Sequence, residues 1–104
     1  MILEKIRQAA EEKLLFLSHA IRQMSRPERM ISAKEIERVV KEGDLVEDYP
    51  QDSRGHSCLI MGWGNEQQGI HVVWSPKEDY LAIITAYIPD PTQWSSDLKR
   101  RLLS

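Results

Sequence analysis

The feature that most constrains this chain is a change of residue pattern at Gly43. Before that glycine, apolar residues recur with helical spacing among charged side chains, and Ser32 with Glu35 forms a capping box. After it, short runs rich in β-branched residues alternate with turn sequences, which is typical of a meander of antiparallel strands. The sequence therefore predicts an α+β fold in which a four-stranded antiparallel sheet follows N-terminal helices. The predicted strands cover residues 45–49, 57–63, 70–74 and 80–88.

Helical spacing predicts three N-terminal helices and one short C-terminal helix. Ser18 is the expected N-cap of the second helix, and Gly43 is the expected C-cap of the third. The apolar run Leu14 to Leu17 has two interpretations, since it could extend the first helix or form a brief extended link. The expected helices cover residues 2–13, 19–26, 33–42 and 92–103.

Length and composition indicate a single domain over residues 1–104. No apolar run approaches the ~20 residues of a membrane span. Cys58 is the only cysteine, so an internal disulfide is excluded and a cytoplasmic location is expected. The three histidines lack the close spacing of a metal motif, so no metal or other cofactor is expected. A net charge of −2 argues against general affinity for nucleic acid, although basic residues cluster locally.

One face of the expected second helix is a candidate phosphate-binding surface. At helical spacing, His19, Arg22 and Arg26 fall within an arc of roughly 100°, opposite Ile21 and Met24. A guanidinium presents a fixed fork of donors to phosphate oxygens, and an imidazole exchanges a proton near neutral pH. The alternative interpretation is an ordinary solvated helix face.

The expected sheet adds His71 and Tyr87 as candidates. Alternation along the strand puts the His71 side chain on the face of Val73. Its partner on the next strand depends on the hairpin loop: a four-residue loop would place it across from Ile84, and a loop longer by one across from Thr85. The alternatives are a core histidine bonded to the backbone and a tyrosine that fills the sheet with its hydroxyl at the rim.

An ordered set of motifs extends over about residues 14–94: SHAIRQM, EDYP, IHVVW and ITAYIPDPTQW. This set resembles a bacterial family catalogued as domain of unknown function 4258. The family's helix histidine corresponds to His19, its EDYP strand end to residues 47–50, and its sheet histidine to His71. The resemblance implies an α+β fold shared with RelE-like and MqsR-like toxins. It also implies a small zinc-finger partner that resembles the MqsA antitoxin.

The function implied by this resemblance is that of a toxin in a toxin–antitoxin-like module. Toxins of this kind are endoribonucleases that cut messenger RNA, free or on the ribosome, without a metal. A general base takes the proton of a ribose 2′-OH, which then attacks the adjacent phosphate. The alternative is a non-catalytic protein-binding module of the same fold, in which the histidines are structural.

The residues expected to carry this chemistry come from the helix face and the sheet. We expect His19 and His71 to form the acid–base pair in unassigned order, with Tyr87 as a further proton donor. Arg22 or Arg26 would stabilise negative charge on the phosphorane. The arginines expected to bind RNA are Arg26 and Arg29.

Overall fold

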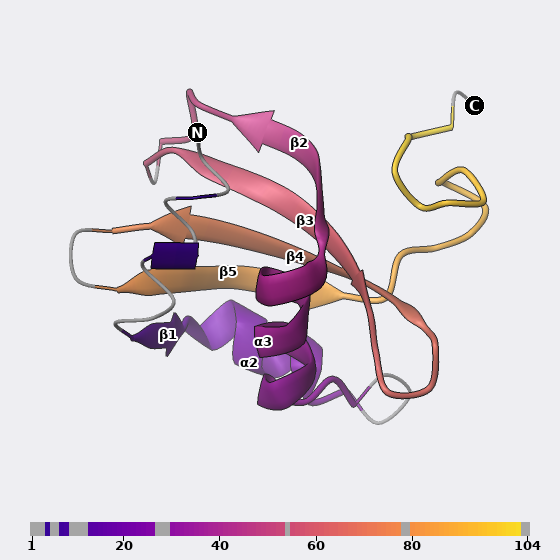
Figure 1. Ribbon diagram of the computed structural model, residues 1–104, viewed down its shortest axis with the longest axis horizontal. Helices are drawn as coiled ribbons and strands as arrows, with labels where there is room; N and C mark the ends of the chain where they lie inside the picture. The colour runs from indigo at the N-terminus through magenta and orange to yellow at the C-terminus, as the bar shows by residue number, and fades with distance from the viewer. Residues whose placement is uncertain are drawn as a thin grey trace.

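A five-stranded mixed sheet forms the centre of the computed structural model, which describes residues 4, 7–8, 13–26, 30–53, 55–77 and 80–102 (Figure 1). The strand order across the sheet is β1-β5-β4-β3-β2. The β2–β3, β3–β4 and β4–β5 pairs are antiparallel, whereas β1 runs parallel to β5. The strands are β1 (Leu14–Phe16), β2 (Asp44–Tyr49), β3 (Ser57–Trp63), β4 (Gly69–Pro76) and β5 (Leu81–Tyr87).

Two helices of the described residues, α2 (Ser18–Met24) and α3 (Ala33–Glu42), pack on one face of this sheet. Ala20 of α2 and Ile36 of α3 are fully buried in the same apolar cluster as Val72 of the sheet. Neither helix is long and apolar enough to cross a membrane. The core therefore lies between the helices and one side of the strands.

The predicted third helix is confirmed, together with its capping box. The Glu35 N–H donates to Ser32 Oγ at 3.2 Å, and the Ser32 N–H donates to the Glu35 carboxylate at 3.0 Å. At the other end, Gly43 donates its N–H to the Val39 carbonyl oxygen at 2.8 Å. A Cβ atom on Gly43 would lie 2.4 Å from that same oxygen. Glycine is needed here for space, because its φ of −77° is open to any residue.

The second helix differs from its prediction at both ends. Leu17, not Ser18, occupies the N-cap position, and no side chain caps the helix there. The Leu17 N–H instead donates to Ile83 O of β5 at 3.1 Å, so pairing of β1 with the sheet sets where α2 begins. Of the predicted first helix, residues 2–13, the structure describes residues 4, 7, 8 and 13. Residues 4, 7 and 8 are helical and residue 13 is not, and the rest of the prediction lies outside the described residues.

The prediction of a four-stranded, purely antiparallel sheet is wrong, because Leu14 to Phe16 form a fifth strand parallel to β5. Leu14 pairs with Leu81, and Phe16 pairs with Ile83. A three-residue apolar run is too short to carry a periodicity that distinguishes strand from helix. Its conformation is decided by pairing with a strand far along the chain, which local sequence does not encode.

The predicted C-terminal helix over residues 92–103 is also wrong. The described residues there form turns, joined by an isolated antiparallel bridge between Trp94 and Arg101. Side chains in this segment bond to nearby backbone N–H groups: Asp90 accepts from Thr92 at 2.8 Å, and Asp97 accepts from Lys99 at 3.1 Å. Such local bonds compete with helical ones, which explains why helical spacing of apolar residues was misleading here.

Candidate functional site

The face of the sheet turned away from the helices carries a group of polar side chains. Ile70, Val72 and Trp74 of β4 belong to the core beneath α2 and α3. Because successive strand residues point to opposite sides, His71 lies on the other face. Figure 1 shows that the C-terminal segment, residues 89–102, leaves β5 and ends well apart from both helices.

The β4–β5 hairpin places His71 directly across from Tyr87. The two predicted partners, Ile84 and Thr85, are therefore wrong. β4 extends to Pro76, so the loop begins one residue later than expected. This later start alone would move the partner of His71 by two positions, from Ile84 to Ala86. A β-bulge within the hairpin moves it by one more. Pairing brings together two side chains that the sequence singled out separately.

Strand β2 adds Glu47 and Tyr49 to the same face. Glu47 pairs with Leu59, and Leu59 pairs with Val73, which is two positions from His71. Paired residues in a sheet point to the same side, so Glu47 shares a face with His71, as does Tyr49 two residues further along β2. We refer to these four residues as the His71 site: Glu47, Tyr49, His71 and Tyr87.

His71 is fully buried, and both of its ring nitrogens have partners. Nε2 lies 2.7 Å from the Leu98 carbonyl oxygen, and Nδ1 lies 3.2 Å from the Tyr87 hydroxyl. A carbonyl oxygen only accepts, so Nε2 carries the hydrogen in the neutral ring and Nδ1 accepts from Tyr87. The Trp94 ring packs edge-on at 4.5 Å between ring centroids. Burial lowers the pKa of His71, opposed by the bond to Leu98 and the charge of Glu47, so the ring is neutral at pH 7.

Glu47 is the charged member of the site and has two donors. Arg101 donates to its carboxylate through Nε at 2.8 Å and through Nη2 at 3.0 Å, and the Tyr49 hydroxyl donates to the same group. The bond from Arg101 lowers the pKa of Glu47, which keeps the carboxylate ionised at neutral pH. Burial and the bond to Glu47 raise the pKa of Tyr49 to about 12, so its hydroxyl remains a donor.

Comparison with known protein families identifies the family of this chain. The family described as Domain of unknown function (DUF4258) matches residues 16–88. The chain belongs to this family. No curated protein and no solved structure matches the chain.

The His71 site lies wholly within the part of the chain matched to DUF4258. Three residues that contact it, Trp94, Leu98 and Arg101, lie outside the matched residues. Sequence reasoning found His71 and Tyr87 but did not select Glu47 or Arg101 as site residues. The EDYP string over 47–50 was the available signal for Glu47, because its alternate residues Glu47 and Tyr49 share one face of the strand.

The predicted residues of the second helix lie elsewhere in the molecule. α2 packs through Ala20 onto the opposite face of the sheet, and His19, Arg22 and Arg26 are exposed. α2 ends at Met24, so Arg26 lies beyond the helix, and the fold does not bring any of the three to the His71 site. Arg29 lies outside the described residues. Among the residues that the structure describes, no group of three or more His, Cys, Asp or Glu side chains could hold a metal ion.

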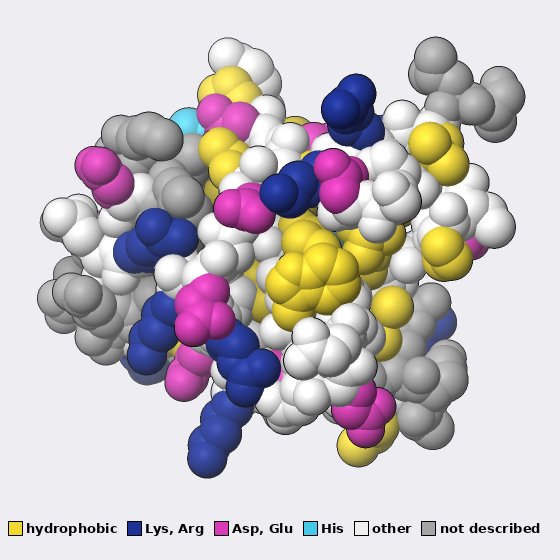
Figure 2. Space-filling model, turned by 45° about the vertical axis from the view of Figure 1, so that its right-hand side comes forward, with side chains coloured by type: hydrophobic (Ala, Val, Ile, Leu, Met, Phe, Trp, Pro, Cys, Tyr) yellow, Lys and Arg dark blue, Asp and Glu magenta, His cyan; other side chains and the backbone are white. Residues whose placement is uncertain are grey.

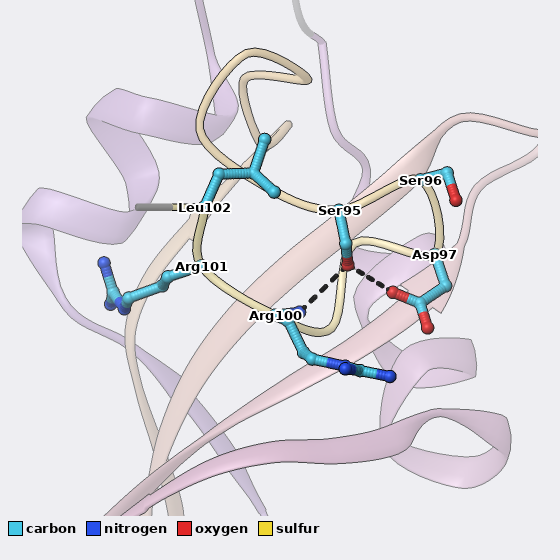
Figure 3. A pocket seen from close by; sticks show the side chains of 6 residues that line it. All are labelled: Ser95, Ser96, Asp97, Arg100, Arg101 and Leu102. Atoms are coloured by element: carbon cyan, nitrogen blue, oxygen red, sulfur yellow. Dashed lines mark hydrogen bonds between the residues drawn. The ribbon is translucent and has the colours of Figure 1, made fainter. Parts of the chain in front are cut away.

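A shallow hollow of about 440 Å³ lies on the C-terminal segment (Figure 3). Its lining comes from Ser95, Ser96, Asp97, Arg100, Arg101 and Leu102. The Ser95 hydroxyl donates to Asp97 at 2.5 Å and accepts the Arg100 N–H at 3.2 Å, so the polar groups of the turn bond to one another. Figure 3 shows the Arg100 and Arg101 side chains pointing in opposite directions from this turn. The hollow is therefore lined by the segment itself, whereas the His71 site lies on strands β2, β4 and β5.

Proposed function

We propose that this protein is a metal-independent endoribonuclease that cuts messenger RNA by attack of a ribose 2′-OH. The observation that carries the proposal is the convergence of Glu47, His71 and two tyrosines on one face of the sheet. A carboxylate that is ionised at neutral pH and an imidazole are the usual side chains for accepting and donating protons in such a reaction. They come from strands β2 and β4, so the intervening β3 separates their backbones by about 10 Å.

In the proposed reaction, Glu47 accepts the proton of the 2′-OH as the 2′ oxygen attacks the adjacent phosphorus. The bond from phosphorus to the 5′ oxygen breaks, and that leaving oxygen takes the Nε2 proton of His71. Because the ring is neutral at pH 7, His71 must first take up a proton from solvent at Nδ1, so that loss of the Nε2 proton returns it to the neutral form. The products are a 2′,3′-cyclic phosphate and a 5′-hydroxyl end. Tyr87 holds the His71 ring in position through Nδ1, and the Tyr49 hydroxyl holds the Glu47 carboxylate in position by donating to it.

This arrangement changes the acid–base pair expected from sequence. Glu47 replaces His19, because His19 belongs to the exposed surface of α2 on the other side of the sheet. The same argument removes Arg22 and Arg26 from the reacting atoms. Their guanidiniums remain able to bind the RNA backbone at a distance from the cut, and this role is part of the proposal.

An exposed aromatic side chain supports RNA as the substrate. Trp63 of β3 lies on the face of the His71 site, two residues beyond Met61, the pairing partner of His71. Its side chain is 50% exposed, so the ring is open to stacking by an unpaired base. Figure 2 shows hydrophobic side chains gathered between acidic and basic ones on the side of the molecule turned to the viewer. Local recognition of this kind suits a chain whose net charge is −2.

We further propose that the protein acts in the cytoplasm as the toxin of a toxin–antitoxin-like module. A small zinc-finger protein would then be its inhibitor, and messenger RNA, free or on the ribosome, its target. The family resemblance of the EDYP and ITAY motifs supports this proposal, since these motifs contribute Glu47, Tyr49 and Tyr87 to the site.

The test is cleavage of a defined single-stranded RNA, free and on ribosomes, by purified protein in EDTA. His71→Gln and Glu47→Gln should each lower the cutting rate by about 10²-fold or more, because each removes a proton-transfer group. A 2′-deoxy substitution at the cut site should abolish cutting and the cyclic phosphate. His56→Gln is the matched control, since His56 pairs with Asp48 outside the site. Loss of activity in His19→Gln instead would move the site to α2.

Folding of each variant is checked through Cys58. Its thiol is buried, and burial raises its pKa to about 12, so a folded variant should resist thiol labelling until urea is added. Equal cutting by His71→Gln and the parent protein would refute the proposed site. Absence of cutting on both free and ribosome-bound RNA, by the parent protein and also by folded variants in which His71 is accessible, would refute the ribonuclease.

The second candidate is a non-catalytic protein-binding module. The observation that favours it is a set of exposed apolar side chains on β1 and the start of α2: Leu15, Leu17 and Ile21, which are 39%, 37% and 51% exposed. In that function the buried His71 would be structural. A folded protein that cuts no RNA, but loses a partner when Ile21 is changed to Glu, would establish the binding module.

A further inference from the structure

The C-terminal segment, residues 89–102, lies directly on the His71 site. Its Leu98 carbonyl oxygen accepts from His71 Nε2 at 2.7 Å, and its Arg101 guanidinium binds both oxygens of Glu47. Its Trp94 ring, only 5% exposed, packs against the His71 ring. The segment therefore occupies the two groups to which the proposed reaction assigns the proton transfers.

We propose that the C-terminal segment is an autoinhibitory strap that closes the His71 site and must leave the sheet before substrate can enter. The proposal rests on the proposed function for the identity of the site. The contacts of the closed state are observed independently of any reaction. With the segment in place, His71 has no exposed surface. The Leu98 oxygen fills the position from which a substrate oxygen would accept the Nε2 proton.

At Gly69, the first residue of β4, the absence of a side chain leaves room for this segment on the sheet. A Cβ atom there would lie 2.1 Å from Leu98 Cδ1, so a larger residue at 69 and the Leu98 side chain could not both keep their positions. Gly69 is two residues from His71 and hence on the same face. Lack of a side chain at this position lets the Leu98 turn approach the strand closely and reach the histidine.

Two further contacts between the segment and the sheet are ion pairs near the surface. Lys99 pairs with Asp44 of β2 at 2.8 Å, and these side chains are 40% and 64% exposed. Arg101 is 61% exposed in its pair with Glu47. Exposed ion pairs contribute little to stability and weaken with salt.

The segment is bonded internally, so it can move as one piece. The Ser95 N–H donates to Arg100 O at 2.8 Å, and the Leu102 N–H donates to Gln93 O at 2.9 Å. These bonds do not involve the sheet and persist when the segment leaves. The segment also lies beyond the residues matched to the family, 16–88, which themselves contain the whole His71 site.

The test opens the segment in the full-length protein by two independent routes. The double substitution Lys99→Glu with Arg101→Glu sets like charges against Asp44 and Glu47. Gly69→Val drives a side chain into the position of Leu98 without changing any charge. The matched control is Arg100→Glu, a reversal on the same turn whose side chain points away from that of Arg101 (Figure 3).

Two readouts separate closure from catalysis. The first is the rate of His71 modification by diethyl pyrocarbonate, followed by mass spectrometry, with exposed His19 as the internal reference. We expect His71 to be protected in the parent and in Arg100→Glu, and to react at least about tenfold faster in both opened proteins. The second readout is RNA cutting in EDTA, which should rise in the same two proteins and in no other.

The outcomes discriminate between the two proposals. A His71 that stays protected in both opened proteins, or a parent that cuts RNA as fast as they do, would overturn the autoinhibitory strap. A His71 that becomes reactive while no protein cuts free or ribosome-bound RNA would overturn the ribonuclease, but would support closure of the site by the segment.

Discussion

At His71, burial and local bonding act on the pKa in opposite directions. Burial is the larger effect and lowers the pKa, while the Leu98 carbonyl and the charge of Glu47 raise it in part. The unfolded chain has no such burial, and its histidine titrates near the ordinary value of about 6.5. The unfolded state therefore binds more protons than the folded state as the pH falls below about 6.5, and folding stability must decrease there.

We predict that the contribution of His71 to the free energy of unfolding is constant above about pH 6.5. Below that pH this contribution falls, by up to ~1.4 kcal/mol per pH unit. His71→Gln should remove this slope, because glutamine does not titrate. The measurement is urea unfolding at pH 8, 7, 6 and 5, a range that stays above the titration of Glu47. His19→Gln, a change on an exposed residue, should keep the slope. A parent protein without any slope would contradict burial of a neutral imidazole.

Among the elements, α3 and the β3–β4 turn are joined through one buried carboxylate. Glu35 is 4% exposed and accepts from the Ser32 N–H and hydroxyl within the capping box. It also accepts from the Asn65 N–H at 2.9 Å and from Gln68 Nε2 at 3.2 Å, both in the turn. Burial alone would raise the pKa of Glu35, but the bonds from Ser32 and the Asn65 N–H, together with the charge of Arg38, outweigh it and lower the pKa. A residue that caps a helix locally thus also positions a turn far along the chain.

This double role predicts unequal costs for the two halves of the capping box. Ser32→Ala should lower the free energy of unfolding by about 1 kcal/mol, the usual value for a lost N-cap. Glu35→Ala should cost roughly 2–3 kcal/mol, because it also leaves donors of the turn without their charged acceptor. Urea unfolding measures both. The matched control is Glu37→Ala, an exposed position on the same helix that should change little. Equal costs for Ser32→Ala and Glu35→Ala would show that the turn bonds contribute nothing.

At the scale of the whole molecule, the structure consists of a sheet, a helical layer on one face and the C-terminal segment on the other. The helical layer is apolar where it meets the sheet, whereas the C-terminal segment combines Trp94 and Leu98 with two exposed ion pairs. Salt screens exposed charges and leaves apolar packing intact. The two layers should therefore respond differently to ionic strength.

We predict that raising NaCl from about 0.05 M to 0.5 M, which shortens the screening length severalfold, speeds modification of His71 but not thiol labelling of Cys58. The histidine reports release of the C-terminal segment, and the buried cysteine reports unfolding of the core. The effect should be absent from a Lys99→Gln and Arg101→Gln double variant, in which no ion pair remains to be screened. If the rate of His71 modification in the parent protein does not change with salt, Trp94 and Leu98 alone hold the segment.

Several features follow from the sequence because they depend on neighbouring residues. The capping box of Ser32 and Glu35 predicts the start of α3, and Gly43 predicts its end. Family membership was also predicted from short motifs and is confirmed by the match over residues 16–88. Strands β2 to β5 were predicted from β-branched runs between turns, close to their observed bounds. In each case the signal that carries the prediction lies within a short stretch of the sequence.

Tertiary structure alone decided the rest. β1 exists only because Leu14 to Phe16 reach β5, and the C-terminal segment lies on the sheet through Trp94 and Leu98, which contact His71, instead of forming a helix. Whether Tyr87 meets His71 depends on one bulge, and whether Glu47 shares their face depends on two strand registers. A shift of one residue in any register would turn a side chain to the opposite face. The His71 site is therefore a property of long-range pairing, to which local residue preferences contribute almost no information.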